Sequence, residues 1–256
     1  MGIAWEAVGT SDTGRVRPGN EDAFLVDAPR GIFLVADGMG GHAAGEIASR
    51  LATEAAGETL ARAVDGAGSG EALTAALQEA FSLAHERIAR CCADQPRTHG
   101  MGTTLTVCVL TPEGNCWIGH VGDSRAYLLR NGHLEQLTVD HTWVQREVDA
   151  GRLSPDAVRR HPLAHILTRV LIADVREEPD LLAPAIQPGD LLLLASDGLT
   201  GMLEDAEIVR ILTQPLPLRK LTATLVREAN ARGGVDNITA VLVRILPGAP
   251  TTPPAG

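Results

Sequence analysis

The sequence predicts an α+β fold in which strands and helices form separate layers. Segments typical of strands come first, helical segments follow, and strands then return along the chain. No internal repeat is visible in the 256 residues, and strands and helices do not alternate regularly. A parallel doubly wound sheet needs that alternation, so a layered α+β domain is favoured.

The predicted strands are short segments with apolar or alternating composition. Residues 104–110 alternate, with Leu105, Val107 and Val109 on one face. The next two segments are joined by the turn Gly-Asp-Ser, so we expect a run of antiparallel strands over 104–110, 115–121 and 125–130. Residues 31–36 are almost wholly apolar, and two later segments are typical of strands buried on both faces: 190–196 and 238–245.

Helical periodicity marks four segments. Residues 43–63 place Ile47, Leu51 and Ala55 four residues apart, and residues 71–92 gather their large apolar side chains on one side. Two shorter helices are predicted near the C-terminus, separated by prolines: 204–213 and 217–231.

The domain organisation follows from composition along the chain. We expect one domain over 1–246 and a Pro-rich, disordered tail over 247–256. Residues 141–180 contain short helical pieces and few strand signals, so we expect them to form a small subdomain at the edge of the core.

Charge and cysteine usage limit the possible functions. The formal net charge of −10 argues against binding to nucleic acid or to an anionic membrane, each of which needs a basic surface. The longest apolar run is too short to cross a bilayer, and the N-terminus lacks the pattern of a signal peptide. Four cysteines without a CxxC pair suggest neither a zinc site nor disulfides, which fits a reducing cytoplasm.

Five aspartates stand at predicted strand ends or in tight turns beside small residues: Asp22, Asp37, Asp123, Asp197 and Asp236. Taken singly, such an aspartate is usually a helix cap or a turn former. Asp37 and Asp197 repeat one design, however, in which an apolar strand ends in a small residue followed by Asp-Gly. Carboxylates that converge at the ends of buried strands repel one another and need cations between them.

The candidate ligands indicate the kind of metal. They are all oxygen donors, which suits hard divalent ions such as Mg²⁺ or Mn²⁺ rather than zinc. Gly38 and Gly198 leave room for a metal or its waters beside the backbone, and the carbonyl of Gly38 is itself a candidate ligand. A P-loop is excluded for the glycine-rich stretch 35–46, because the Gly-Lys-Ser/Thr ending is missing.

Seven stretches of the chain form an ordered set of motifs: 11–24, 35–46, 100–110, 119–145, 161–171, 189–199 and 233–243. In order and in register, they resemble the bacterial form of the PPM family, the metal-dependent serine/threonine protein phosphatases of type 2C. The resemblance covers about residues 5–245, and one such motif alone would be weak evidence.

The resemblance implies an αββα sandwich, in which two antiparallel sheets face each other and helices cover the outside. It also implies a binuclear Mn²⁺ or Mg²⁺ centre held by Asp37, the Gly38 carbonyl, Asp197 and Asp236. Asp123 matches a bacterial ligand that shares a third, looser metal with Asp197.

Other positions match supporting roles in the family. Asp22 matches a residue that reaches the metals, often through water, and Glu21 stands where a weaker outer role is expected. Arg17 matches the arginine that grips the substrate phosphate. Residues 141–180 correspond to the flap beside the site, which influences substrate choice.

The implied reaction is direct hydrolysis of phosphoserine and phosphothreonine. Two ions share a water and lower its pKa, and the resulting hydroxide attacks phosphorus in line while Arg17 and the metals stabilise the phosphoryl oxygens. The leaving oxygen needs a proton, and His42 is the nearest candidate donor, although Met39 occupies the position of the general acid of the animal enzymes. The alternatives are that a metal-bound water supplies this proton and that His42 is a structural residue at a helix start.

Two positions depart from the bacterial pattern. His165 stands where relatives usually have asparagine, and Ile172 stands where they usually have glycine. Both lie beside the flap and outside the predicted metal set, so they bear on flap conformation and substrate preference.

Three other functions compete with this interpretation. Cys91 and Arg97 have the C-x5-R spacing of cysteine-dependent phosphatases, but no glycine lies between them and Cys91 falls near the end of a predicted helix. A phosphoprotein-binding module that holds metals without turnover is the second alternative. A metal-dependent nuclease is the third, and the acidic net charge counts against it.

The expected partners are phosphoprotein substrates and, by resemblance, a Hanks-type serine/threonine kinase whose action the phosphatase reverses. We expect a cytoplasmic monomer with no nucleic-acid or membrane partner.

Overall fold

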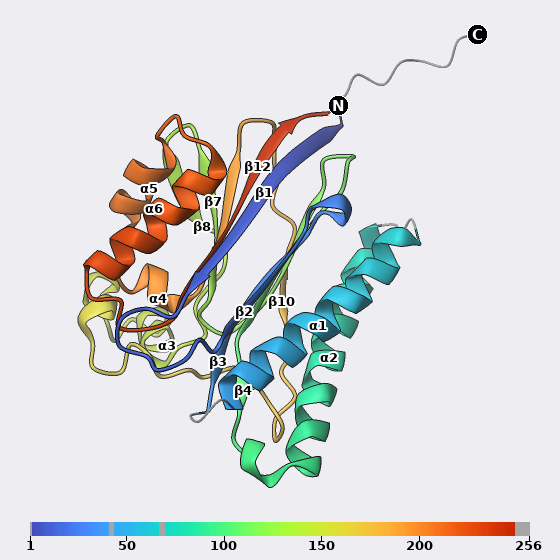
Figure 1. Ribbon diagram of the computed structural model, residues 1–256, viewed down its shortest axis with the longest axis vertical. Coiled ribbons are helices and arrows are strands. Elements are labelled where there is room, and N and C mark those ends of the chain that lie inside the picture. Colours follow the sequence, from blue (N-terminus) through green and yellow to red (C-terminus); the bar gives the residue numbers. More distant parts are fainter. Residues whose placement is uncertain (1, 41–43, 67–69, 249–256) are drawn as a thin grey trace.

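The computed structural model describes residues 2–40, 44–66 and 70–248. Two antiparallel β-sheets pack face to face, and a pair of helices covers the outer face of each sheet (Figure 1). The predicted αββα sandwich is therefore confirmed.

The first sheet has five strands and carries the shorter helices. In spatial order the strands are β1 (Ile3–Asp12), β12 (Ile238–Pro247), β11 (Leu191–Ala195), β7 (Arg125–Arg130) and β8 (His133–Gln136). The helices α5 (Asp205–Leu212) and α6 (Leu218–Ala231) cover its outer face, where their buried apolar side chains join those of β7, β11 and β12 in one cluster.

The second sheet has seven strands and carries the long helices. In spatial order the strands are β10 (Asp180–Leu182), β6 (Cys116–Val121), β5 (Leu105–Leu110), β3 (Ile32–Met39), β4 (Gly102–Thr103) and β9 (Leu171–Ile172), and β2 (Asp22–Asp27) also pairs with β3. The helices α1 (Ala44–Asp65) and α2 (Gly70–Asp94) cover its outer face.

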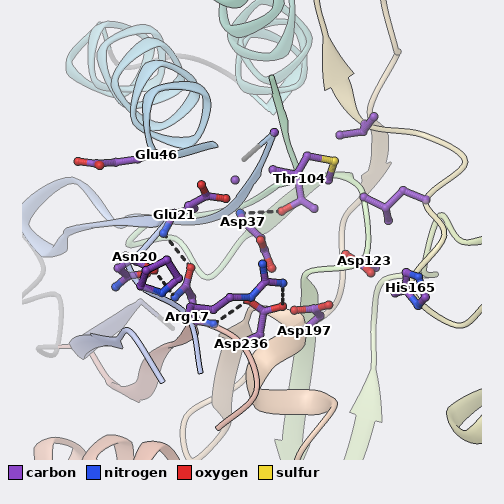
Figure 2. A pocket seen from close by; sticks show the side chains of 18 of the residues that line it. Arg17, Asn20, Glu21, Asp37, Glu46, Thr104, Asp123, His165, Asp197 and Asp236 are labelled. Carbon is purple, nitrogen blue, oxygen red and sulfur yellow. Dashed lines mark hydrogen bonds and ion pairs between the residues drawn. The ribbon is translucent and has the colours of Figure 1, made fainter. Parts of the chain in front are cut away.

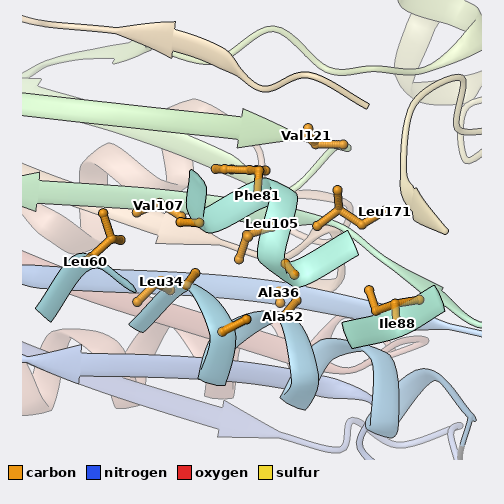
Figure 3. Close-up of a cluster of buried hydrophobic side chains, with 14 of the residues drawn as sticks. Leu34, Ala36, Ala52, Leu60, Phe81, Ile88, Leu105, Val107, Val121 and Leu171 are labelled. Carbon is orange, nitrogen blue, oxygen red and sulfur yellow. The ribbon is translucent and has the colours of Figure 1, made fainter. Parts of the chain in front are cut away.

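Strand β3 shows why the central strands are apolar on both faces. Leu34 and Ala36 point toward α1 and α2, where they join the cluster shown in Figure 3. Phe33 and Val35 point the other way, into the core between the two sheets. Since successive side chains of a strand face opposite sides, a strand between two apolar layers must be apolar throughout. This explains the continuous apolar segments that precede the candidate aspartates.

One predicted pairing is wrong. Strands β5 and β6 form a hairpin, but β6 and β7 belong to different sheets, so the Gly-Asp-Ser turn does not join neighbouring strands. Gly122 turns the chain there with a φ of +112°, and a Cβ atom at this position would come within 2.5 Å of the Thr104 side chain. In sequence, a tight turn between two apolar segments looks the same whether the two strands pair within one sheet or belong to different sheets. The crossing places Asp123 on the connection between the two sheets.

Strand β1 was not among the predicted strands. It runs antiparallel to β12 over its whole length, from Ile3 opposite Pro247 to Asp12 opposite Ile238. It is an edge strand with mostly half-buried residues, so its sequence carries no strong apolar signal.

The segment 141–180 contains the two helical pieces that its sequence predicted. These are α3 (Trp143–Asp149) and the 3₁₀ turn η3 (Pro155–Arg160). The other short elements of the chain are η1 (Ala28–Arg30), η2 (Pro96–Thr98) and α4 (Asp197–Thr200).

The expected tail over 247–256 overlaps the end of β12 at Pro247, and residues 249–256 lie outside the described part of the chain. In the described ranges, no helix has the length and apolar character needed to cross a lipid bilayer.

Candidate active site

A cavity of about 800 Å³ opens where the ends of the two sheets meet. Figure 2 shows aspartates from distant parts of the sequence lying near one another, with Arg17 beside Asp236. Its lining includes six of the predicted site residues: Arg17, Asp37, Gly38, Asp123, Asp197 and Asp236.

Strand ends explain why these carboxylates meet. Asp37 lies near the end of β3, and Asp197 follows β11 as the first residue of α4. Asp236 precedes β12, the strand that pairs with β11. Asp123 lies on the crossing from β6 to β7. Each carboxylate therefore ends or begins a strand whose position is fixed by the core.

The two Asp-Gly steps place a glycine at each point of closest backbone approach. A Cβ atom on Gly38 would lie 2.2 Å from the carbonyl oxygen of Gly45, and one on Gly198 would lie 1.9 Å from that of Asn237. No side chain fits at either position. The room for a metal or its waters expected beside both glycines stays a prediction; Gly38 lines the cavity and Gly198 does not.

Thr104 fixes the backbone of Asp37 on both sides. The amide of Asp37 donates to Oγ1 of Thr104 at 2.9 Å, and the amide of Thr104 donates to the carbonyl of Asp37 at the same distance. The Thr104 hydroxyl also shares a hydrogen bond with Ser124, next to Asp123. Thr104 thus connects the end of β3, which carries Asp37, with the turn that carries Asp123.

Asp22 lies behind the cavity rather than in its lining. It stands directly opposite Asp37 in the β2–β3 pair, and its Oδ2 accepts hydrogen bonds from Ser196 at 2.8 Å and from Thr239 at 2.5 Å. Its other oxygen, Oδ1, is buried without a hydrogen-bond partner. Burial raises the pKa of Asp22 to about 7, against the lowering effect of the two hydroxyls.

The carboxylates of the cavity are poorly compensated. Burial, followed by the charges of Asp22, Asp197 and Asp123, raises the pKa of Asp37 well above its usual range. Burial also raises the pKa of Asp123 and of Asp197, and Oδ1 of Asp197 is buried without a partner. Buried acidic groups with orphaned oxygens need a positive charge to stay ionised. An all-oxygen donor set of this kind fits Mg²⁺ or Mn²⁺.

The described side chains are not yet arranged around an ion. Within the described ranges, no three His, Cys, Asp or Glu side chains gather closely enough to hold a metal as they stand. Arg17 instead donates to Oδ2 of Asp236 at 2.6 Å, so one candidate ligand is occupied by an ion pair. Asp236 is therefore engaged in an ion pair through one oxygen, while its carboxylate keeps further lone pairs with which it can bind a metal.

The loop that carries Arg17 is held by Asn237, a residue that was not among the predicted site residues. The buried Asn237 side chain donates to the carbonyls of Thr13 and Gly19, each at 2.9 Å. Its oxygen accepts from the amide of Glu21 at 2.8 Å. Asn237 follows Asp236 directly, but an asparagine before a strand looks like an ordinary turn residue in a sequence.

The remaining predicted residues lie at different places. His42 lies outside the described residues. Met39 and His165 line the cavity. Ile172 pairs with Gly102 across β4 and β9, and a Cβ on Gly102 would come within 2.6 Å of the isoleucine side chain. The isoleucine therefore fits because a glycine stands opposite it.

Cys91 and Arg97 do not form a phosphate-binding loop. Cys91 lies within α2, near its end, and Arg97 donates to the side chain of Gln95. Neither residue lines the cavity. The helix position predicted for Cys91 is confirmed, which counts against the cysteine-dependent alternative.

Comparison with known proteins decides the family. The sequence model of the family described as protein phosphatase 2C matches residues 9–246. The chain belongs to the protein phosphatase 2C family. Membership identifies it as a protein-serine/threonine phosphatase, as the sequence predicted.

The match to this chain covers nearly all of one curated relative and less than half of another. The serine/threonine phosphatase stp of Listeria innocua is 37% identical over 240 residues, which are 91% of this chain and 93% of that protein. The serine/threonine protein phosphatase PstP of Mycobacterium tuberculosis is 39% identical over 236 residues, which are 92% of this chain and 44% of that protein.

Solved structures agree with the fold. The crystal structure of Mycobacterium tuberculosis PstP has a TM-score of 0.86 at 36% identity and covers 96% of this chain and 100% of that one. The catalytic domain of PstP in complex with two manganese ions has a TM-score of 0.85, with the same identity and coverage.

Proposed function

We propose that this phosphatase hydrolyses phosphoserine and phosphothreonine in proteins at the cavity lined by Asp37, Asp197 and Asp236, with Mn²⁺ or Mg²⁺ as cofactor. The observation that carries the proposal is the meeting of buried, poorly compensated carboxylates from separate strand ends beside one arginine. A fold without a catalytic role would have little reason to retain buried carboxylates of this kind.

Two ions would be held by Asp37, the carbonyl of Gly38, Asp197 and Asp236. Asp22 would support them from behind with its unpartnered Oδ1, and Asp123 would share a third ion with Asp197. When bound, such ions neutralise phosphoryl oxygens and lower the pKa of a water, which supplies the nucleophile.

Arg17 would bind the substrate phosphate. Its guanidinium is half-exposed at the cavity and is held by a single carboxylate, so it can turn toward an anion once Asp236 is released. A planar guanidinium suits bidentate binding of phosphate oxygens. Asn237 would hold the backbone of the 13–21 loop so that this movement is confined to the side chain.

Direct hydrolysis is favoured over a covalent intermediate. Among the described lining residues, the hydroxyl of Thr104 is already engaged with the Asp37 amide and with Ser124. The described lining pairs no hydroxyl or thiol with a base that would activate it. We propose His42 as the donor of the proton that the departing serine or threonine oxygen needs.

The domain limits and the cellular setting are also proposals. Residues 1–246 would form the phosphatase domain, with 141–180 as its flap subdomain. The four free cysteines of the chain, two of which have sulfur atoms 3.7 Å apart, support a reducing cytoplasm. A Hanks-type serine/threonine kinase would supply the phosphoproteins, and the phosphatase would act as a monomer.

Hydrolysis of p-nitrophenyl phosphate and of a phosphothreonine peptide with added Mn²⁺ tests the proposal. Wild type should release phosphate, and EDTA or the Asp197→Asn change should abolish release. Asp94→Asn, an exposed aspartate at the end of α2, is the matched control and should keep wild-type rates. Wild type that binds Mn²⁺ without releasing phosphate would support the metal-holding binding module instead.

A further inference from the structure

Strand β2 is an edge strand with one open side. It pairs with β3 on one side, and in the described part of the chain no other strand pairs with it. It lies beside α1 and also contacts β1 of the facing sheet (Figure 1). An open strand edge carries amide and carbonyl groups that can pair with another extended chain.

The hydrogen bonds of β3 show which backbone groups of β2 face the open side. The amide of Gly38 donates to the carbonyl of Glu21 at 3.1 Å, so these two residues form a hydrogen-bonded pair. Asp37, the preceding residue of β3, faces away from β2, since its carbonyl accepts from the amide of Thr104 at 2.9 Å. Asp22 stands opposite Asp37, and its backbone therefore faces the open side.

Every second residue of β2 faces the open side in the same way. Hydrogen-bonded and non-bonded pairs alternate along an antiparallel ladder, so the amides and carbonyls of Phe24 and Val26 point outward like those of Asp22. The amide of Asp22 donates to the side chain of Asn20 at 3.1 Å, which ends this row. Among residues 2–40, 44–66 and 70–248, no side chain or loop bonds to the outward groups of Phe24 and Val26. The strand therefore offers donors and acceptors at the spacing that an added strand requires.

A second cavity, of about 740 Å³, lies along this open side and is called the β2 groove below. The floor is β2 itself, and Ser11 and Asn20 line the groove at one end of the strand. Asn20 also lines the catalytic cavity, so the β2 groove reaches the loop that carries Arg17. The wall on α1 is a stripe at helical spacing: Arg50, Thr53, Glu54, Gly57, Glu58 and Ala61.

The side chains of β2 alternate between two surroundings. The Phe24 ring lies against Gly9 of β1, where a Cβ atom would come within 2.3 Å of it, and Phe24 remains 37% exposed. Leu25 points the other way and packs on the apolar cluster beneath α1. An added strand would alternate in the same manner, with one set of side chains beside Phe24 and the other beneath α1.

The α1 wall is acidic and accessible. The side chains of Glu54 and Glu58 are 47% and 53% exposed. Glu54 pairs with Arg50 at 3.2 Å, and Glu58 pairs with Arg87, which lies outside the groove. Arg50 is the single cation among the described lining residues, whereas four carboxylates line the groove: Asp22, Asp27, Glu54 and Glu58. Side chains that face α1 from an added strand therefore suit the groove best when they are basic.

We propose that the β2 groove binds an extended segment of a partner protein, in which basic residues alternate with apolar ones, as an antiparallel strand beside β2. Backbone hydrogen bonds would hold the segment, the apolar side chains would cover Phe24, and the basic ones would face Glu54 and Glu58. A second copy of this chain fits less well, because it would bring the same carboxylates and a further net charge of −10 to the groove. The proposal concerns binding and goes beyond the reaction at the catalytic cavity.

Fluorescence anisotropy with a labelled hexapeptide of alternating valine and arginine tests the proposal on the full chain. In an antiparallel pair, residues opposite Phe24 have their side chains on its face, so the valine amides would bond to β2 and the arginine amides would point away. N-methylation of the valine amides should therefore raise Kd at least about tenfold. N-methylation of the arginine amides is the matched control, with the same charge, and should leave Kd unchanged.

Glu54→Lys should raise Kd for the unmodified peptide at least about threefold. Glu79→Lys, which changes an exposed carboxylate on α2 outside the groove, should keep the wild-type Kd. Both variants should keep the wild-type rate with p-nitrophenyl phosphate, which reports a folded chain.

Three results would overturn the proposal. They are no binding of the unmodified peptide, equal Kd for the two N-methylated peptides, and an unchanged Kd in Glu54→Lys. Concentration-dependent dimerisation of wild type that the peptide reverses would assign the groove to a second copy instead. Loss of p-nitrophenyl phosphate hydrolysis by wild type would contradict the proposed function alone, because peptide binding is measured without turnover.

Discussion

Replacing Asn237 by alanine should both destabilise the protein and weaken phosphate binding. The side chain makes three hydrogen bonds, with the carbonyls of Thr13 and Gly19 and the amide of Glu21, at 2.8 to 2.9 Å. All three partners belong to the loop that carries Arg17, so the loop loses its main attachment to the start of β12.

The size of the effect follows from these contacts. A buried hydrogen bond contributes about 1 kcal/mol net, so three contribute about 3 kcal/mol to the free energy of unfolding. A loss of this size raises the unfolding equilibrium constant about 150-fold. For a chain of this length it lowers the melting temperature by about 6 to 12 °C.

Two assays separate stability from positioning. Urea unfolding of Asn237→Ala measures the loss of stability, and p-nitrophenyl phosphate kinetics well below the melting temperature should show a raised KM because Arg17 is no longer held in place. Asn230→Ala is the matched control, since the Asn230 side chain makes one hydrogen bond, to Asp12, and should cost about 1 kcal/mol with KM unchanged. A loss below about 1 kcal/mol with wild-type KM for Asn237→Ala would refute the attachment described here.

Three further predictions concern the carboxylates and the cysteines. Asp37→Asn and Asp236→Asn should each lose nearly all turnover while circular dichroism shows a folded chain, and a wild-type rate for Asp236→Asn would remove it from the metal site. In EDTA-treated protein, stability should fall as pH rises, because burial raises the pKa of Asp22 from 3.8 to about 7 and the folded chain favours its protonated form. Urea unfolding at pH 5 and pH 8 should differ by about 3 kcal/mol from this group, and greater stability at pH 8 would contradict the sign. Iodoacetamide should leave phosphatase activity intact, because Cys91 lies outside the cavity, and loss of activity on its alkylation would revive the cysteine-dependent alternative.

The candidate site was predictable where local sequence and chemistry coincide. Asp37 and Asp197 stand out because each ends a continuous apolar strand and is followed by glycine. Asp22 was grouped with them, and the structure places it behind the cavity, bonded to Ser196 and Thr239. Hydroxyls that bond a buried carboxylate come from strands far away in the sequence, so no local pattern reveals them.

The residues that hold the site in place also could not be found from local sequence patterns. Asn237 and Thr104 are ordinary in sequence, the first just before β12 and the second between β4 and β5. Their roles depend on which loops the folded sheets bring within hydrogen-bond distance. The crossing at Gly122 was missed for a similar reason, because only packing decides whether two strands joined by a tight turn pair or face each other.

The sequence by itself determined the layered α+β class, most of its central strands and long helices, and an oxygen-rich set of aspartates suited to hard metal ions. These properties depend on periodicity and on residue chemistry, which act over a few neighbouring residues. Only the tertiary structure decided that Arg17 pairs with Asp236 and that Ile172 rests against Gly102. Such contacts join residues far apart along the chain, and they are fixed by the packing of one sheet on the other rather than by any local preference.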